Sequence, residues 1–187
     1  MPIRKLNIGC GNEPMDGYIN IDLHPEEYPG KEILGADALH LPFKDGSIDE
    51  IYMSHFLEHL SYINAFNGFL EWRRVLCLGG KITIIVPDMN IMAQEWLRPP
   101  KDNTPEAMHN KVMEQMHFWG FAIYGTHRGK EQDHRSAWTS NILASILLDC
   151  KFTNMKLYRK DYIFWLWCDA YKAAYDEEVL RHQLFGE

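Results

Sequence analysis

KLNIGCG at residues 5–11, with YINID at residues 18–22 close behind it, decides the fold. Each stretch predicts a short apolar strand; the first runs into Gly-x-Gly, and the second ends on Asp22. Glycine at positions 9 and 11 lets the backbone take positive φ angles and lets a ligand approach the chain closely. A carboxylate at the tip of the neighbouring strand can accept both hydroxyls of a ribose. The pair predicts a nucleoside site at the carboxyl ends of parallel strands, with a plain glycine turn between core strands as the simpler alternative.

Composition and charge narrow the class of protein. A chain of 187 residues, 46% apolar and 24% charged, fits one globular domain with a sizeable core. The net charge of −7 comes without a basic patch, which argues against a nucleic-acid partner and favours a small-molecule substrate. The apolar runs are too short to cross a bilayer, and the first residues lead into a strand rather than a signal peptide, so no membrane partner is expected.

The cysteines indicate the compartment. Cys10, Cys77, Cys150 and Cys168 are scattered along the chain without a Cys-x-x-Cys pair. This pattern argues against a zinc knuckle or a disulfide framework. It favours a reducing environment, so the expected location is the cytoplasm.

Strands and helices alternate along the chain. Apolar and β-branched runs predict strands at Leu6–Gly9, Ile19–Asp22, Glu32–Ala36, Ile48–Ser54, Lys81–Val86, Phe152–Lys160 and Asp161–Tyr171. Apolar spacing and capping signals predict helices at Phe66–Leu76, after Asp88 through Leu97, at Pro105–Trp119 and from Thr139 or Ser140 to Asp149. Gly79-Gly80 is expected to cap the first of these helices. An acidic helix or tail would end the chain.

This order predicts an α/β fold with a doubly wound, mostly parallel, seven-stranded sheet. The last two strands are expected to be antiparallel, because the junction near Lys160 is too tight for a parallel crossover. Residues of about 98–136 mix polar and aromatic side chains without a clear period, so they predict an insertion in a single domain that spans residues 1–187.

Five short motifs follow one another in a fixed order. They are Asn7–Gly11, Asp22, Gly35–Ala38 continuing into Leu41–Phe43, Ser54–Leu60, and Gly79–Ile82 leading to Val86–Asp88. The ordered set resembles the class I S-adenosylmethionine-dependent methyltransferases of the small bacterial and phage type. The resemblance covers the first half of the chain well and the last third loosely. It implies a Rossmann-like methyltransferase fold, S-adenosylmethionine as cofactor, and methyltransferase activity.

The resemblance also implies a set of cofactor-binding residues. Gly9 and Gly11, with Cys10 between them, would let backbone amides meet the methionine part of the cofactor. Asp22 would hold the ribose. Asn7 stands where members of the family often carry an acid that helps to hold the methionine amine; it could accept a hydrogen bond but lacks the charge.

The adenine and the methyl group would be held by the next motifs. Leu23 would cover one face of the adenine, Asp37 would accept from its amino group, and the Ala38 amide would meet a ring nitrogen. Ser54 and His55 would lie beside the methyl-bearing sulfur, where the fourth strand ends. Transfer of the methyl group requires alignment, exclusion of water and sometimes a base.

The connections after the first two strands are short. Only Asn12–Gly17, with Pro14 inside, and His24–Lys31, with two prolines, replace the helices that larger members carry there. We therefore expect two flanking helices to be reduced to loops. The sheet face that they would cover is then left to the insertion, to the C-terminal tail or to another subunit, and the last option predicts a homo-oligomer.

His55-Phe56-Leu57-Glu58-His59 matches the His-x-x-Glu-His pattern of zinc proteases. On a helix, positions i and i+4 would put both imidazoles on one face, with Glu58 close by as a base. This pattern would indicate a metal-dependent hydrolase that uses His55, Glu58 and His59. The alternative is the first helical turn after the fourth strand, where the methyltransferase pattern accepts Leu-Glu-His.

The insertion carries His109, His117, His127 and His134. One reading is a lid over the substrate that contributes a base; the other is a solvated loop with a few packed aromatic side chains. His134 is the preferred candidate for a base, and His55 is its competitor because it lies nearer the expected methyl group.

The predicted function is transfer of a methyl group from S-adenosylmethionine to a small-molecule or glycan-linked acceptor. The alternative is a non-catalytic S-adenosylmethionine- or nucleoside-binding protein, since Asn7 lacks the acid and no clear nucleophile-activating set is present. A dinucleotide-binding reductase would share the glycine turn, but it expects a third glycine in a following helix, where this chain has Asn12-Glu13-Pro14.

Overall fold

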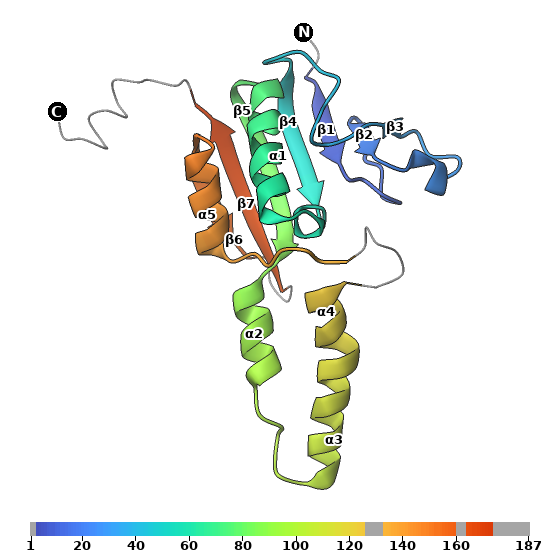
Figure 1. Cartoon of the computed structure of the whole chain (residues 1–187), viewed down its shortest axis with the longest axis vertical. Helices are drawn as coiled ribbons and strands as arrows, with labels where there is room; N and C mark the ends of the chain where they lie inside the picture. Colours follow the sequence, from blue (N-terminus) through green and yellow to red (C-terminus); the bar gives the residue numbers. More distant parts are fainter. Residues whose placement is uncertain (1–2, 126–132, 160–163, 174–187) are drawn as a thin grey trace, which may run out of the picture.

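The computed structural model describes residues 3–125, 133–159 and 164–173, with the side chains of Trp119 and Phe121 left out. Seven strands form one sheet in the order β3-β2-β1-β4-β5-β7-β6 (Figure 1). The strands are β1 (Lys5–Ile8), β2 (Ile19–Asp22), β3 (Leu34–Gly35), β4 (Ile48–Ser54), β5 (Leu76–Pro87), β6 (Phe152–Tyr158) and β7 (Trp165–Lys172). The predicted α/β class and Rossmann-like sheet are confirmed.

The direction of the strands also agrees with the prediction. β1 pairs in parallel with β2 and with β4, and β2–β3 and β4–β5 are parallel too. β7 runs antiparallel to both β5 and β6. Residues 160–163, which join β6 to β7, and the predicted C-terminal helix or tail beyond residue 173 lie outside the described residues.

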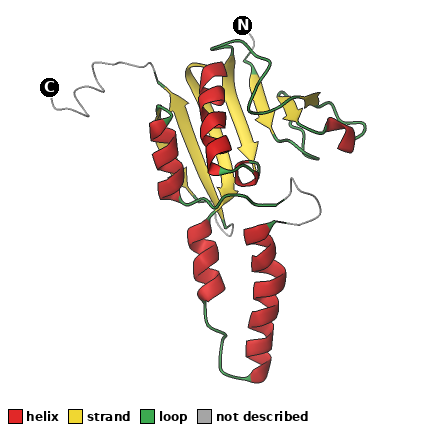
Figure 2. Cartoon of the chain, in the orientation of Figure 1, coloured by secondary structure: helices red, strands yellow, loops and turns green. Residues whose placement is uncertain are grey.

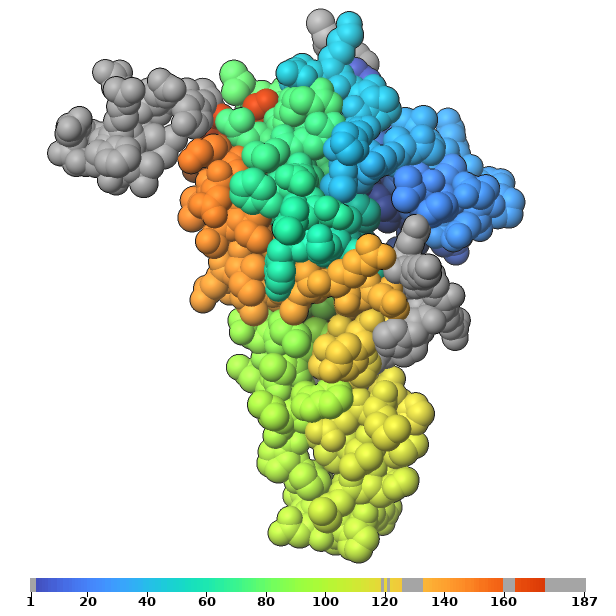
Figure 3. All heavy atoms as spheres, in the orientation of Figure 1, coloured from blue at the N-terminus to red at the C-terminus, as the bar shows by residue number. Residues whose placement is uncertain are grey.

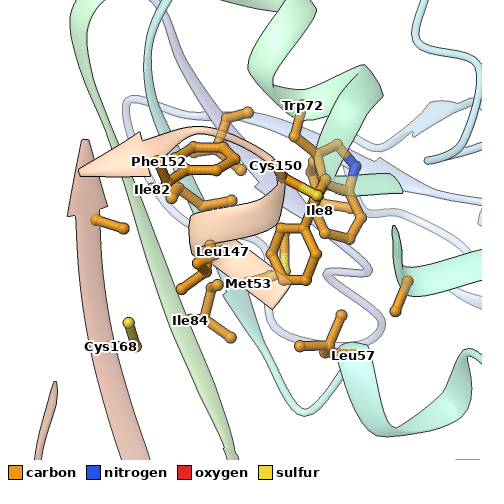
Figure 4. Close-up of a cluster of buried hydrophobic side chains, with 14 of the residues drawn as sticks. Ile8, Met53, Leu57, Trp72, Ile82, Ile84, Leu147, Cys150, Phe152 and Cys168 are labelled. Carbon is orange, nitrogen blue, oxygen red and sulfur yellow. The ribbon is translucent and has the colours of Figure 1, made fainter. Parts of the chain in front are cut away.

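Two helices, α1 (Tyr62–Val75) and α5 (Ser140–Asp149), cover one face of the sheet (Figure 2). Alternate strand residues point toward them, because successive side chains of a strand face opposite sides. The resulting core joins Trp72 and Phe69 of α1, Leu147 of α5 and strand residues such as Ile84 and Phe152, all fully buried (Figure 4). This core is what fixes the strand ends on which the site is built.

Strand residues on the other face are polar or aromatic and bind one another. Glu50 accepts from the Tyr18 hydroxyl at 3.0 Å and pairs with Lys5 at 3.3 Å. Asp169 accepts from the Thr83 hydroxyl at 2.7 Å and from the Tyr158 hydroxyl at 3.3 Å. These groups are satisfied without a helix above them, because each carboxylate has hydroxyl or ammonium partners on neighbouring strands. The predicted homo-oligomer stays a prediction.

The two reduced connections are present as predicted. Residues 9–18 join β1 to β2 without a helix, and the link from β2 to β3 holds only the single 3₁₀ turn η1 (Pro25–Glu27). The prolines in both links disfavour longer helices, because proline lacks the backbone N–H that a helix interior needs. The third strand is shorter than expected, with Leu34–Gly35 in place of Glu32–Ala36.

The prediction that Gly79-Gly80 caps α1 is wrong. Ser61 begins the helix, its hydroxyl accepting from the Asn64 N–H at 3.2 Å, and the helix ends at Val75. β5 starts at once, and its pairing with β4 shifts register between Ile48–Leu76 and Glu50–Lys81. Gly79, at φ 77°, lies in that irregular stretch, where the left-handed backbone suits glycine.

Several helices between β5 and α5 project from the carboxyl end of the sheet (Figure 1 and Figure 3). They are α2 (Met89–Leu97), α3 (Pro105–Glu114), the π-helical turn η3 (Gln115–Trp119) and α4 (Gly120–Tyr124). The predicted helix at Pro105–Trp119 therefore continues five residues further, through a π turn. Within the described residues, no helix combines the length and the apolar character needed to cross a membrane.

Candidate functional site

A cavity of about 390 Å³ opens at the carboxyl ends of β1, β2 and β4. Its walls bring together residues that the sequence separates: the glycine turn after β1, the end of β2, the segment after β3 and the turn after β4. Seven of the ten predicted cofactor-binding residues line it, namely Gly9, Gly11, Asp22, Leu23, Asp37, Ala38 and His55. The geometry is that of an open parallel sheet, where ligands bind outside the carboxyl ends of the strands.

The glycine turn is required by its backbone and by its neighbours. Gly9 has φ 64° and Gly11 has φ 48°, in the left-handed region that side chains disfavour. A Cβ on Gly9 would lie 2.3 Å from Cδ2 of Phe56, so there is no room for a side chain. The turn thus gives the cavity a floor of bare backbone.

The Asp22 carboxylate ties the first two strands together. Its Oδ2 accepts from the Gly11 N–H at 2.9 Å, and its Oδ1 accepts from the His24 N–H at 3.0 Å. A carboxylate has about four acceptor positions, so lone pairs remain for a pair of hydroxyl donors. The Gly11 N–H is committed to Asp22, however, and is not an independent donor for a ligand.

Asp37 and Ala38 form the far wall. Oδ1 of Asp37 accepts from the Leu39 N–H at 2.8 Å, and Oδ2 lies 2.9 Å from Nδ1 of His40. Burial raises the pKa of the Asp37 carboxyl, but the hydrogen bonds from His40 and Leu39 outweigh it and hold that pKa below its usual value. The Ala38 carbonyl accepts from the indole N–H of Trp72 at 2.9 Å, which fixes this wall to α1.

Three predicted residues, Asn7, Cys10 and Ser54, are not among the described residues that line the cavity. Asn7 is buried, and its amide donates to the Glu13 carbonyl at 3.2 Å and to Asn20 at 3.0 Å, so it stabilises the loop between β1 and β2. Burial, and then the charge of Asp22, raises the pKa of the Cys10 thiol to about 11. Ser54 is the half-buried last residue of β4.

His55 lies at the opposite end of the cavity, in a strained conformation. Its φ is 52°, although it is not glycine, and its N–H donates to the Ile85 carbonyl at 3.0 Å. The ring meets the Trp165 ring edge-on at 4.4 Å between centroids. Nδ1 lies 3.1 Å from Oε1 of the buried Glu58. Such strain persists where the surroundings over-determine it, and it is concentrated at functional sites.

The comparisons with known proteins agree with this geometry. Residues 6–84 match the sequence model of the family described as "Methyltransferase domain". A solved S-adenosylmethionine-dependent methyltransferase from Methanosarcina mazei is similar over 94% of this chain and 95% of its own, with TM-score 0.60 and 18% identity. The chain therefore has the fold of the S-adenosylmethionine-dependent methyltransferases, and residues 6–84 match the family's sequence model.

Two further proteins are similar to this chain. The solved 1,6-didemethyltoxoflavin-N1-methyltransferase of Burkholderia thailandensis, with bound S-adenosylhomocysteine, is similar over 92% of this chain and 72% of its own, with TM-score 0.56 and 15% identity. At such identities the likeness shows the shared fold. An uncharacterised protein of Methanocaldococcus jannaschii is 38% identical over 60 residues, which are 32% of this chain and 25% of the relative. The matched segment thus spans only a quarter of that relative. These similar proteins agree with S-adenosylmethionine as the predicted cofactor.

The residues that line the cavity fit S-adenosylmethionine. The bare backbone at Gly9, where a Cβ would collide with Phe56, suits a ligand that lies directly on the turn. Asp22 and Asp37 present carboxylate oxygens in the same cavity, as the hydroxyls of a ribose and the amino group of an adenine require. Leu23, 56% exposed, offers an apolar side chain between them.

The His-x-x-Glu-His segment is not one helix. His55 precedes the short 3₁₀ turn η2 (Leu57–His59), and its positive φ takes it off the helical path. The expected pairing of His55 with His59 on one helix face is therefore wrong. His59 instead meets His134, with 5.1 Å between ring centroids. Burial lowers the pKa of His134, and the neighbouring charge of Glu58 only partly offsets this.

Most of the histidines in the insertion lie away from the cavity. His109 and His117 belong to the projecting α3 and η3, and His127 lies outside the described residues. His134 lines a small second cavity beside Glu58 and Trp138, and its neighbour Arg135 lines the main one. Among the described residues of the insertion, the last ones reach the site, and the lid remains a proposal.

Sequence reasoning missed several residues of the cavity wall. Tyr28, Phe56, His59 and Arg135 all line it, and Trp165 packs against His55. Tyr28 had a local signal, as the aromatic residue in the proline-rich link after β2. Arg135 and Trp165 had none, because they reach the site only through the folding of distant segments onto the end of β4.

Proposed function

We propose that this protein transfers a methyl group from S-adenosylmethionine to a small-molecule acceptor that binds between the cofactor and the wall formed by His55, His59 and Arg135. When bound, S-adenosylmethionine supplies a sulfonium methyl group to an attacking nucleophile. The observation that carries the proposal is that the glycine turn, both aspartates and a carboxylate-oriented histidine share one cavity.

We assign the cofactor to the residues that line the cavity. The turn at Gly9 and Gly11 would lie against the methionine part, Asp22 would accept from the ribose hydroxyls, and Asp37 with Ala38 would hold the adenine edge. This order follows the wall from the end of β1 to the segment after β3. We give Asn7, Cys10 and Ser54 supporting roles, because they do not line the cavity; the side chains of Asn7 and Cys10 instead contact the loop after β1.

His55 is the residue that we propose as the general base. Glu58 accepts at Oε1 from Nδ1 of His55, and this contact holds the tautomer with the proton on Nδ1. Nε2 then carries the lone pair; it is buried and has no partner among the described residues, so a movement of the side chain would bring it to the acceptor. It would accept the proton that the acceptor atom loses as that atom bonds to the methyl carbon. His134, which lines the second cavity, would not touch the acceptor.

The acceptor class follows from the wall facing the cofactor. This wall contains two histidines and one arginine, with Phe56 and Leu60 beside them. It suits a molecule that combines a polar or anionic group with an apolar body. A small molecule or a glycan-linked group meets this description. The cytoplasmic location expected from the scattered cysteines stays a prediction.

The test begins with cofactor binding. Calorimetric titration with S-adenosylhomocysteine should give one site per chain, and Asp22→Ala should weaken it by about 10- to 100-fold, through loss of about 1.5–3 kcal/mol of hydrogen bonds to a charged group. Glu106→Ala, on the exposed start of α3, is the control and should bind as the wild type does. Wild-type protein without measurable heat would end the proposal.

Activity is tested with methyl-labelled S-adenosylmethionine and a small-molecule extract of the source cells. The wild type should move label into a product, and His55→Ala should slow this by about 10²- to 10⁴-fold while S-adenosylhomocysteine binding persists. Binding without transfer to any fraction would favour the non-catalytic binding protein. An unchanged rate in His55→Ala would remove the base assignment alone.

A further inference from the structure

Three side chains beside the cofactor cavity converge in a way that methyl transfer does not require. Glu58 and His59 come from η2, and His134 comes from the segment before α5. One ligand atom from each lies within 4.8 Å of the other two. Two nitrogens and one carboxylate oxygen are a donor set that first-row transition metals bind.

Glu58 provides an independent reason to expect a ligand. Its residue is 1% exposed. Oε1 contacts Nδ1 of His55, whereas Oε2 is buried and has no partner among the described residues. A buried acceptor without a partner has lost its hydrogen bonds to water without replacement, which is destabilising, and more so when the group is charged. A cation at Oε2 would remove this cost.

The two histidines are oriented as metal ligands are. Nδ1 of His59 lies 3.3 Å from the Asp133 carbonyl, a contact in which the ring N–H donates and Nε2 keeps its lone pair. His134 has a hydrogen bond to the backbone of Ile123. Metal-binding histidines usually donate their second N–H to a carbonyl or carboxylate, which fixes the ring and the tautomer.

The backbone holds the two segments together. The Glu58 carbonyl accepts from the Arg135 N–H at 2.8 Å and from the Ser136 N–H at 3.2 Å. The Ser136 hydroxyl in turn accepts from the indole N–H of the buried Trp138 at 2.8 Å. The three donors therefore stand on a rigid frame, and only small side-chain rotations are needed to draw them around an ion with bonds of about 2.0–2.2 Å.

We propose that Glu58, His59 and His134 bind a divalent transition-metal ion, Zn²⁺ by preference. Three protein ligands leave a fourth position open, as in zinc sites that do chemistry. His55 is not a ligand in this site, because its Nδ1 serves Glu58. The site thus differs from the His-x-x-Glu-His arrangement that the sequence alone would indicate.

The location of the ion gives it a role. His59 also lines the main cavity, so the metal would stand in the cavity wall. Its open position would hold water or, if the proposed methyl transfer is correct, an oxygen of the acceptor. A metal-bound hydroxyl loses its proton more easily, which would favour an acceptor with an oxygen nucleophile.

The experiment measures the metal without relying on activity. Full-length protein is stripped with chelator, given Zn²⁺ or Co²⁺ in excess, passed through a desalting column and analysed for bound metal. One ion per chain is expected, with Co²⁺ showing the visible bands of four-coordinate cobalt. Zn²⁺ should also raise the melting temperature, because an ion that binds only the folded chain stabilises it.

Variants assign the ligands. His59→Ala and His134→Ala should each lower metal affinity at least about tenfold, whereas His109→Ala, at an exposed position of α3, should not. His134→Gln and Glu58→Gln keep the side-chain size, so they serve if an alanine variant does not fold by circular dichroism. Full metal retention in these folded variants, or equal loss in His109→Ala, would overturn the site.

S-adenosylhomocysteine binding is measured on the same samples, which separates this inference from the proposed function. Wild-type protein that binds S-adenosylhomocysteine but no stoichiometric metal would refute the metal site and leave the methyltransferase proposal standing. Protein that binds one metal through His59 and His134 but no S-adenosylhomocysteine would refute the methyltransferase proposal and leave the metal site standing.

Discussion

At the level of single residues, Gly9 combines two constraints that are usually separate. Its φ of 64° disfavours a side chain, and a Cβ would lie 2.3 Å from Phe56. Gly17 has φ 78° but nothing within 4 Å of its Cβ position. The two glycines therefore separate the cost of backbone strain from the cost of a collision.

We predict that Gly9→Ala lowers the free energy of unfolding by about 2–5 kcal/mol, the sum of left-handed strain and overpacking against Phe56. Gly17→Ala should cost only the strain, about 1–2 kcal/mol. Urea denaturation measures both. Gly9→Ala should also weaken S-adenosylhomocysteine binding, since the turn lies in the cavity wall. Equal effects of the two variants on stability would show that Phe56 moves aside without cost.

The same scale shows what could be predicted from sequence. Gly9, Asp22 and Asp37 are at the cavity because each lies at or just beyond the end of a strand, and parallel strands bring their carboxyl ends to one edge. Asn7 does not line the cavity, because its contacts with Glu13 and Asn20, which depend on the path of a loop, hold it against that loop. His59 and His134 are 75 residues apart, and no local pattern indicates that their rings meet.

Among the elements, α1 holds the segment after Asp37 in part through the ion pair between Arg74 and Glu71. Arg74 donates to Oε2 of Glu71 at 2.7 Å and to the carbonyls of Phe43 at 2.8 Å and Leu41 at 3.1 Å. Oε1 of Glu71 accepts from the Leu41 N–H at 2.7 Å. The segment after Asp37 is thereby tied to the helix, so the position of that carboxylate depends on a distant pair of charges.

We predict that Glu71→Gln lowers the free energy of unfolding at pH 7 by about 1–3 kcal/mol, because it removes hydrogen bonds to a charged group and leaves Arg74 partly unpaired. The hydrogen bond with Arg74 lowers the pKa of Glu71. Stabilisation from a depressed carboxyl pKa is complete above the unfolded pKa of about 4.3 and is lost as pH falls through the folded pKa. The difference between the two proteins should therefore shrink below about pH 4.

Denaturation of both proteins between pH 7 and pH 3 measures this difference, with Glu106→Gln as the matched control at an exposed helix start. The control should change stability by less than about 0.5 kcal/mol at every pH. A Glu71→Gln effect that stays constant down to pH 3 would mean that packing of the side chain, rather than its charge, holds the segment.

The bounds of helices and strands could be predicted where the local sequence carries a signal, but not where the pairing of strands determines them. The β-branched run of residues 81–86 lies within β5, and the capping residue Thr139 begins α5 as expected. Gly79-Gly80 misled because a glycine pair after a helix usually caps it. Here α1 ends earlier, and the glycines fall where β5 and β4 lose register, which only the pairing of the strands reveals.

In the whole molecule, the projecting helices differ from the sheet in what stabilises them. α2 is anchored, since its buried N-cap Asp88 accepts from the Arg159 guanidinium at 2.7 Å. α3 has no buried residue. Hydrogen bonds join the distal helices to α2: Lys111 donates to the Glu95 carbonyl at 2.8 Å, and Gln115 donates to the Trp96 carbonyl at 2.6 Å. Whether an insertion folds over a cavity or away from it depends on such contacts. The sequence does not reveal them, so it predicted an insertion at this place but could not fix its direction.

We predict that hydrogen exchange divides the molecule along this line. Amides of β4 and β5, buried in the core, should exchange only by global unfolding, whereas those of α3 should open locally at a cost at least about 2.8 kcal/mol smaller and exchange about a hundredfold faster. Lys111→Met should speed exchange in α3 and leave β5 unchanged, with Lys101→Met, at an exposed position outside the helices, as control.

The concentration dependence of this exchange decides what covers α3. Its neighbours and its own surface expose apolar side chains, Met116 at 66% and Met108 at 54% among them. If the chain is a monomer, protection of α3 should be the same at low and high protein concentration. Protection that rises with concentration would mean that a second copy buries these methionines, because burial of apolar surface drives association. Protection of α3 equal to that of β5 at every concentration would contradict the division itself and show that the projection is part of the same cooperative unit as the sheet.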